Sequence, residues 1–589
     1  MAEPDPALLE ARSLSRRAGA RFLLKDVGLR VGPGEVVAVI GPNGSGKTTL
    51  LRLLAGVLKP SAGAVLLDGR PLASLGPRQR ALRVAYLPQL HEVPQGFTAR
   101  GLVEMGRHPH EEDGEEERAE AVERGLAAVG AASLANRRLE TLSGGELQKI
   151  FLASVVAQGS PLLLLDEPTV FLDPGRAAEV QRALLGLVGA GRALIVATHD
   201  LDFARRAATR VLALRDGRIA LEGPPASVLS PVALRDLFAL PEEAAGASKA
   251  PSTDPAAPRP APGRAHGRAA IGLVTLACAA VLLAAPFVGP PLAASRDLTA
   301  SSASFILWQL RVPRVLLAAL AGAGLALAGA AFQALFRNPL ATPYTLGVAS
   351  GAAFGAVAAI LLGVGAGVAG LTATSLAALL GALAVTGAAY GLGRRRGALP
   401  TATLLLAGVT LGFFFSSLIL FLQYLADFTE AFRILRWLMG EVRVVGYGTF
   451  AVLAPLGLVG ALLVLGHRSE LNLLLTGEEL AHSRGADVER VKRRVFLGAS
   501  LLVAGIVSVC GPIGFVGLVV PHAARSLLGP DLRRLAPACV PVGAAFLVLC
   551  DGVARLALAP AELPVGVVTA LVGAPVFLAI LLRRGAAAV

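Results

Sequence analysis

The sequence predicts an α/β P-loop domain followed by an all-α polytopic membrane domain of about ten transmembrane helices. The 589-residue chain is 54% hydrophobic and only 16% charged, whereas soluble domains average about 25% charged residues. In the first part, short apolar runs bounded by Gly, Pro or Asp alternate with amphipathic stretches, which is typical of a parallel sheet with crossover helices. In the second part, apolar segments of bilayer-spanning length follow one another.

Composition divides the chain into three regions. Residues 1–240 form the α/β domain, residues 241–267 are a linker rich in Pro, Ala, Ser and Gly, and residues 268–589 form the membrane domain. The start, Met1–Glu10, is acidic and has no apolar core, so we expect no signal peptide and a cytoplasmic α/β domain. The acidic run Glu111–Glu120 is interpreted as a solvated helix face.

The net charge of +13 is typical of proteins that meet nucleic acid or a membrane surface, and the hydrophobic content favours the membrane. We therefore expect no nucleic-acid partner. The four cysteines all lie in apolar runs and include no CxxC pair. They are predicted to be small buried hydrophobic residues rather than disulfide or zinc ligands.

Ten candidate spans are expected, with the seventh and eighth forming a short, broken or tilted pair. They lie near 269–288, 313–334, 345–365, 371–392, 401–424, 449–466, 495–511, 513–528, 535–556 and 566–583. Arginines are more frequent in the connections that would be inside, such as Arg394–Arg396. The positive-inside rule then predicts an inner-membrane protein with both termini cytoplasmic.

The strand Val36–Ile40 is followed by a P-loop that opens a helix at Thr48 and Thr49. The loop consists of Gly41, Pro42, Asn43, Gly44, Ser45, Gly46, Lys47 and Thr48. Backbone N–H groups of such a loop surround a phosphate, the lysine reaches the β- and γ-phosphates, and the threonine hydroxyl can bind Mg²⁺. ATP and Mg²⁺ are therefore the expected cofactors.

A second apolar strand ends in two acids, Asp166 and Glu167. Asp166 is expected to hold Mg²⁺, directly or through water. Glu167 would face the γ-phosphate, where a carboxylate can polarise the attacking water.

The run Leu142–Glu146, LSGGE, resembles the signature of ABC ATPases, and further motifs of that family follow in order. The resemblance implies that Gln89 senses Mg²⁺ and the membrane partner and that His199 contacts the γ-phosphate. It also implies that Asp173 is the D-loop acid, and that Ser143, Gly144 and Gly145 close over ATP held by a second chain. A homodimer is therefore expected.

The resemblance is incomplete at two places. The family usually stacks adenine on an aromatic residue before the P-loop, but here the first aromatic is Phe22. Stacking on Phe22 or on an arginine plane both stay open. The D-loop begins Val170-Phe171, where a small polar residue is common in the family.

The second half resembles the permeases of type II ABC importers, which take up iron–siderophores, haem and cobalamin. The similar motifs are Arg337–Pro343 (RNPLATP), Gly511–Leu518 (GPIGFVGL), Glu562–Gly566 (ELPVG) and Gly573–Pro575. ATPase and permease, which are ordinarily separate chains, are here fused. The cytoplasmic interruption from Leu471 to Gly485 resembles the coupling helices that contact the ATPase.

Arg311, Arg314 and Arg555 lie at the expected outer side and depart from the positive-inside trend. The resemblance implies that they dock acidic residues of an extracytoplasmic substrate-binding protein; interfacial snorkelling is the alternative. The leading hypothesis is ATP-driven import of a metal chelate, iron–siderophore first and haem or cobalamin next. A membrane-tethered regulatory ABC ATPase and an exporter are the alternatives.

Overall fold

The computed structural model describes residues 7–170, 172–238, 268–288, 304–365, 367–368, 371–393, 400–559 and 561–585. The predicted linker, Arg394–Arg396 and Phe171 lie outside these residues. The chain forms two compact units. The first comprises Met1–Arg264 together with Leu473–Val488, and the second comprises Ala265–Asn472 and Glu489–Val589.

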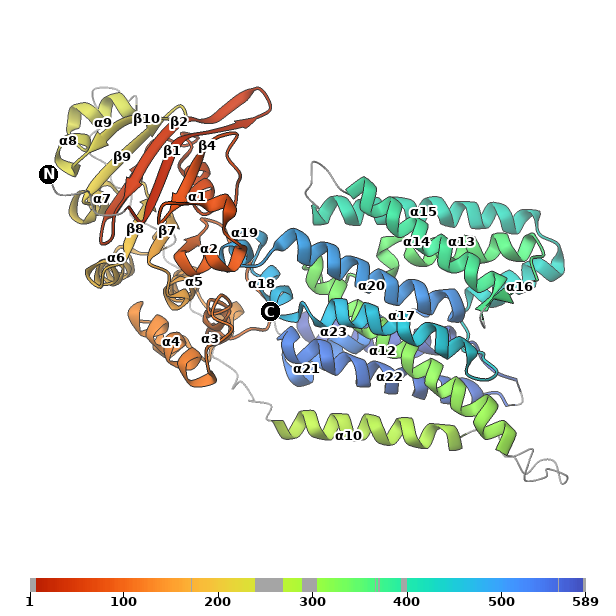
Figure 1. Ribbon diagram of the computed structural model, residues 1–589. Helices are drawn as coiled ribbons and strands as arrows, with labels where there is room; N and C mark the ends of the chain where they lie inside the picture. The colour runs from red at the N-terminus through yellow and green to blue at the C-terminus, as the bar shows by residue number, and fades with distance from the viewer. Residues whose placement is uncertain are drawn as a thin grey trace. The chain divides into compact units, whose positions relative to one another are not determined.

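The first unit contains two β-sheets (Figure 1). The larger has the strand order β10-β9-β3-β8-β7-β6 and is parallel except for the edge strand β10. Every residue of its central strands β3, β7 and β8 is buried, as continuous apolar runs predict for a parallel sheet covered on both faces. Its strands are β3 (Val36–Ile40), β6 (Val84–Leu87), β7 (Leu162–Asp166), β8 (Ala193–Ala197), β9 (Arg210–Arg215) and β10 (Arg218–Gly223).

The smaller sheet is antiparallel, with the order β2-β1-β4-β5. Its strands are β1 (Leu9–Ala18), β2 (Arg21–Val31), β4 (Ala62–Leu67) and β5 (Arg70–Pro71). One apolar cluster, which includes Leu14, Leu24, Leu50 and Leu164, joins both sheets through the helix after β3.

Helices complete the first unit. They are α1 (Lys47–Leu54), α2 (Pro77–Arg83), α3 (Ala99–Met105), α4 (Glu115–Ala128), α5 (Gly144–Gln158), α6 (Pro174–Gly189), α7 (Leu201–Ala207), α8 (Pro225–Val228), α9 (Pro231–Phe238) and α19 (Glu478–Ser483). Most residues of the predicted acidic face lie exposed around the start of α4. Helix α19 belongs to the segment Leu473–Val488, which comes from the membrane half of the sequence but packs within the first unit.

The second unit is helical. Its helices are α10 (Arg268–Ala284), α12 (Val312–Leu335), α13 (Val348–Leu361), α14 (Ala373–Gly393), α15 (Thr401–Leu425), α16 (Phe428–Leu438), α17 (Gly448–Leu465), α18 (Arg468–Leu474), α20 (Val488–Cys510), α21 (Val516–Leu528), α22 (Leu532–Leu556) and α23 (Val565–Gly585). A short hairpin joins β11 (Gly367–Val368) to β12 (Leu371–Thr372). The four cysteines are buried here, as predicted.

Six helices of the described residues are long and apolar enough to cross a membrane: Ile306–Leu335, Ala373–Gly393, Thr401–Leu425, Gly448–Leu465, Val488–Cys510 and Leu532–Leu556. Shorter apolar helices occupy the other four expected segments, so a count of ten spans stays a prediction. The expectation of a short seventh segment is wrong. Helix α20 has 23 residues because its first turns are polar and extend the helix beyond the apolar run.

Glycines let the membrane helices approach each other at backbone distance. A Cβ atom on Gly329 of α12 would lie 1.9 Å from the carbonyl oxygen of Gly517 on α21. A Cβ atom on Gly322 of α12 would lie 2.1 Å from the carbonyl oxygen of Gly543 on α22. Neither position admits a side chain, which is the close packing expected of small residues in membrane helices.

The motifs that resemble importer permeases meet inside this unit. The Pro343 ring lies against Gly517, and the Tyr344 hydroxyl donates to the Ile513 carbonyl. Phe515, which has a left-handed φ of 65°, packs against Gly573. Segments that are far apart in the sequence therefore form one packed region.

Candidate functional site

A polar cleft lies at the carboxyl edge of the larger sheet in the first unit. Strands β3, β8, β7 and β6 are neighbours in this order, and the loops that follow them carry the P-loop, His199, the pair Asp166 and Glu167, and Gln89. Because carboxyl ends of parallel strands meet at one edge, the fold collects these residues. They line a cleft of about 340 Å³ together with Arg21 and Leu23. The structure thus brings together the predicted phosphate-binding, acidic and sensing residues.

The P-loop has the backbone geometry that its glycines predict. Gly41 has φ +147°, and a Cβ atom there would lie 2.2 Å from the Leu214 carbonyl oxygen. Lys47 opens α1 and donates from Nζ to the Gly41 carbonyl at 2.8 Å. The buried hydroxyl of Ser45 has no hydrogen-bond partner within the described part of the chain. The loop therefore offers free donors at a helix N-terminus, where a phosphate binds favourably.

The acids lie opposite the lysine. Burial raises the pKa of both Asp166 and Glu167, while the charge of Lys47 opposes the rise in each. Burial also lowers the pKa of Lys47, against the attraction of the two carboxylates. Glu167 has a left-handed φ of 53°, and its Oε1 lies 3.2 Å from Nε2 of His199. This unusual backbone conformation directs a carboxylate into a functional site.

The cleft fits a magnesium ion. Oδ2 of Asp166 is buried and has no hydrogen-bond partner among the described residues, and the Thr48 hydroxyl lies near enough to lower the pKa of Asp166 by a hydrogen bond. Asp166, Thr48 and Gln89 would hold the ion, because carboxylate, hydroxyl and amide oxygens are ligands that Mg²⁺ prefers. A bound ion would neutralise charge on the phosphates.

The signature residues do not line this cleft. Ser143 caps the N-terminus of α5 in a capping box with Glu146: the Ser143 hydroxyl accepts from the Glu146 N–H, and the Glu146 carboxylate accepts from the Ser143 N–H at 2.9 Å. Asp173 caps α6 by accepting from the Arg176 N–H at 3.0 Å. The cleft of one chain therefore contains the P-loop, the two acids, Gln89 and His199. It does not contain the signature residues 143–145 or Asp173.

Two cleft residues were not assigned from the sequence. Arg21 and Leu23 line the cleft, and they share one face of strand β2 because side chains alternate along a strand. Phe22 points the other way, with the Arg17 guanidinium 4.7 Å from its ring centroid. Side chains at successive positions of a strand point to opposite faces. This alternation along β2 was the sequence signal that could have placed Arg21, and not Phe22, in the cleft.

In the second unit, two of the arginines predicted to dock a partner are paired inside the chain. Arg314 donates to Asp551 at 3.0 Å and to Glu562 at 2.9 Å. Nε of Arg555 lies 3.0 Å from the Asp551 carboxylate, and its Nη1 donates to the Val288 carbonyl at 3.0 Å. Asp551 is only 1% exposed. Both Arg314 and Arg555 thus contact Asp551 within the chain, and their role in docking a partner stays a prediction.

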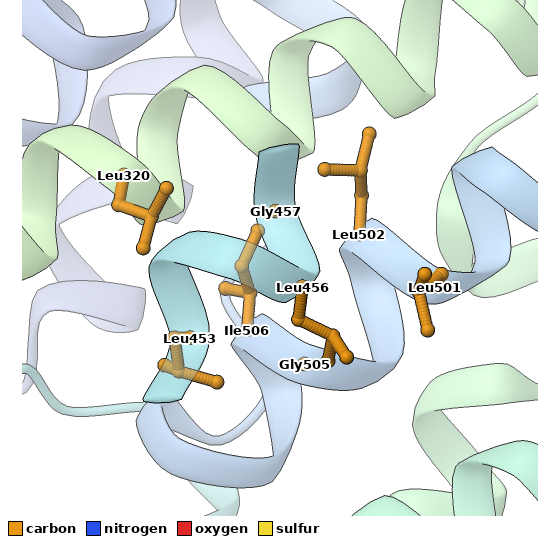
Figure 2. Close-up of a pocket in the computed structure, with 8 residues that line it drawn as sticks. All are labelled: Leu320, Leu453, Leu456, Gly457, Leu501, Leu502, Gly505 and Ile506. Atoms are coloured by element: carbon orange, nitrogen blue, oxygen red, sulfur yellow. The ribbon is translucent and has the colours of Figure 1, made fainter. Parts of the chain in front are cut away.

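A small pocket between α12, α17 and α20 carries no polar side chain (Figure 2). Its lining residues are Leu320, Leu453, Leu456, Gly457, Leu501, Leu502, Gly505 and Ile506. Such a lining gives no orientation to a metal chelate, so we interpret the pocket as incomplete packing beside the glycines.

The fold and the cleft define an ATP-hydrolysing ABC transporter in which the ATPase and a membrane unit share one polypeptide. Residues 24–170 match the ABC transporter family, and residues 272–583 match the FecCD transport family. The second match covers more than half of the chain. The chain belongs to the FecCD transport family.

Relatives match one half each. A cobalamin import system permease protein of Halobacterium salinarum is 43% identical over 283 residues, which is 48% of this chain and 75% of the relative. A hemin import ATP-binding protein of Nocardia farcinica is 44% identical over 248 residues, which is 40% of this chain and 84% of the relative. A solved metal-chelate type ABC transporter in an inward-facing conformation aligns at 30% identity, over 53% of this chain and 99% of that chain, with a TM-score of 0.47.

Proposed function

We propose that the chain imports a metal chelate across the cytoplasmic membrane and drives this import by ATP hydrolysis. The single observation that carries the proposal is the fusion: a phosphate-binding cleft and a helical unit of the FecCD transport family occur in one chain. The intact motif series argues against a regulatory ATPase and against an exporter. Ten spans, with the ATPase and both termini cytoplasmic, complete the proposed topology.

Among the chelates we now place cobalamin first, ahead of the iron–siderophore that the sequence alone suggested. The substrate passes through the permease, so relatives of the permease half are more informative than relatives of the ATPase half. The permease relatives include several cobalamin import proteins. The uptake experiment also includes haem, which the name of an ATPase relative suggests, and iron–siderophores.

Uptake into proteoliposomes tests the function. Vesicles that contain the full chain and ATP are offered labelled cobalamin, haem or a ferric siderophore together with the matching binding protein. We expect ATP-dependent accumulation of cobalamin, and Glu167→Gln serves as the matched inactive control. Accumulation without ATP, or of none of the three chelates, would contradict the proposal.

The working unit is proposed to be a homodimer with two composite ATP sites. In each site, the P-loop of one chain would face Ser143, Gly144 and Gly145 of the other. A mixed dimer of one Lys47→Ala chain and one Ser143→Arg chain keeps one intact site, so we expect it to hydrolyse ATP at a reduced rate. Dimers in which one chain carries both substitutions serve as a control, because they keep no intact site. Active monomers, seen by mass photometry, would overturn this assembly.

Docking of a substrate-binding protein is proposed for the end of the membrane unit that carries Arg311, Arg314 and Arg555. A partner carboxylate would have to displace Glu562, which is 37% exposed, from Arg314. The test uses Arg311→Glu because reversal of Arg314 would also break its ion pair with Asp551, which joins α12 to α22. We expect Arg311→Glu to weaken capture of the binding protein and leave basal ATP hydrolysis unchanged. Unchanged capture would remove Arg311 from the docking surface.

A further inference from the structure

The segment Leu473–Val488 contacts two helices that have different roles at the ATP site. The first contact is an ion pair between Glu479 and Arg52. Nη2 of Arg52 lies 2.9 Å from Oε1 of Glu479, and Nε donates to Oε2 at 3.1 Å. This bidentate geometry fixes direction as well as charge. Arg52 belongs to α1, the helix that Lys47 opens.

The second contact is made by Arg484, which is 1% exposed. Its Nη2 donates to the hydroxyl of Ser154 at 2.7 Å. Beside it, the amide of Gln158 donates to the Ser483 carbonyl at 3.1 Å. Ser154 and Gln158 belong to α5, the helix that Ser143 caps.

The two contacts differ in their surroundings. The Glu479–Arg52 pair is about one-third exposed and is neutral as a pair. Among the described residues, no carboxylate lies within ion-pair distance of Arg484, and its Nη1 has no hydrogen-bond partner. Burial lowers the pKa of Arg484 to about 9. Burying a guanidinium without a counter-ion is costly, so packing alone does not explain an arginine here.

Helices α1 and α5 of one chain serve different ATP molecules if the proposed dimer is correct. Helix α1 carries Lys47 and Thr48, which line the cleft of the same chain. Helix α5 begins at the signature, which lies outside that cleft and would close over the ATP of the partner chain. A segment that is tied to both helices is therefore tied to both sites.

We propose that Glu479 and Arg484 are positioning residues through which each permease segment responds to both ATP sites of the dimer. Glu479 acts on the site of its own P-loop, and Arg484 acts on the site to which its own chain supplies the signature. This inference rests on the proposed homodimer with composite sites. It assigns each contact to one of the two ATP sites. Although Glu479 and Arg484 are only five positions apart, they would act on different ATP sites of the dimer.

The mixed dimer with one intact site tests this direction. In it, the Ser143→Arg chain supplies the working P-loop and the Lys47→Ala chain supplies the working signature. Glu479→Gln is added to the Ser143→Arg chain in one dimer and to the Lys47→Ala chain in another. Arg484→Ala is added to each chain in the same way. ATP hydrolysis is measured in proteoliposomes, with Glu478→Gln as the matched control for a neighbouring acid.

We expect a crossed pattern. Glu479→Gln should lower the rate about threefold or more when it is on the P-loop donor, and much less on the signature donor. Arg484→Ala should lower the rate when it is on the signature donor, and much less on the P-loop donor. Arg484→Lys should retain part of the rate that Arg484→Ala loses. The charge swap Arg52→Glu with Glu479→Arg, on the P-loop donor, should restore more activity than either single change.

Equal effects on both chains would overturn the inference, because a merely structural role does not depend on which chain donates which motif. Unfolding temperature and ATP affinity of each homodimeric variant separate misfolding from lost coupling. If Arg484→Ala does not fold, Ser154→Ala removes the same contact from the α5 side and must show the same crossed dependence. A starting mixed dimer without any activity would instead refute the composite sites themselves.

Discussion

Buried charges are arranged in opposite ways in the two halves of the molecule. Among the residues that the structure describes, Lys47 in the ATPase cleft donates only to backbone carbonyls, and Oδ2 of Asp166 has no hydrogen-bond partner. In the membrane unit, the two guanidinium groups of Arg314 and Arg555 are paired with two carboxylates, Asp551 and Glu562. Charged groups without a side-chain partner are available to bind a ligand, whereas ion-paired groups stabilise the packing of helices. Substitutions in the cleft should therefore cost activity, and substitutions in the membrane cluster should cost stability.

The largest expected effect is loss of stability on removing Asp551. Asp551→Ala leaves the buried Arg555 and the partly buried Arg314 without their shared carboxylate, and breaking a buried pair in this way costs about 3–5 kcal/mol. We expect a large fall in unfolding temperature and in the yield of folded protein in membranes. Glu562→Gln, at the more exposed end of the same cluster, is the matched control and should cost about 1 kcal/mol or less. Equal losses would show that Asp551 is not the centre of the cluster.

Glu167→Gln should show the opposite behaviour. Loss of a general base lowers turnover by about 100-fold or more, while Asp166 and Lys47 still bind Mg²⁺ and ATP. We expect ATP affinity and unfolding temperature to stay near those of the parent protein, and a closed dimer to accumulate with ATP. Single-turnover hydrolysis measures the step, and near-normal turnover would contradict the role of Glu167.

Lys47→Ala should weaken binding rather than the chemical step alone. A hydrogen bond from a charged group contributes about 1.5–3 kcal/mol, so ATP affinity should fall about tenfold or more. Because Lys47 bonds only backbone in the described cleft, we expect little change in unfolding temperature without ATP. Titration with ATP distinguishes this variant from Glu167→Gln, which should bind normally.

The smallest effect concerns His482 in the segment that packs on the ATPase, where a buried group is kept neutral. Burial, together with the charge of Arg80, lowers its pKa to about 4 from 6.5, and Asp487 opposes the shift. The unfolded segment therefore takes up a proton first, and the contribution of neutral His482 is present above pH 6.5 and lost as pH falls toward about 4. By about pH 5.5, we expect this protonation to destabilise the first unit by about 1–2 kcal/mol. In His482→Gln, unfolding followed at pH 7 and pH 4.5 should show a smaller difference than in the parent.

Local sequence signals predicted the cleft, because its residues follow buried strands and belong to contiguous motifs. They also placed the apolar helices closely, as with α15 (Thr401–Leu425) against the expected 401–424. Long-range pairing carried no such signal. Arg314 and Asp551 are 237 positions apart, so no local pattern in the sequence shows that Arg314 has a carboxylate partner within the chain. The burial of Arg484 was equally hidden, since it depends on Ser154, 330 positions away.

The glycine contacts between α12, α21 and α22 have a consequence for movement during transport. Backbones that touch without intervening side chains have no rotamers to exchange, so they cannot slide past one another by repacking. The three helices should thus translate and rotate as one stiff block. The conformational change that opens the transport pathway to one side or the other must therefore occur between other helices. A bulky residue at Gly329 would separate the three helices, because the contact has no room for its side chain.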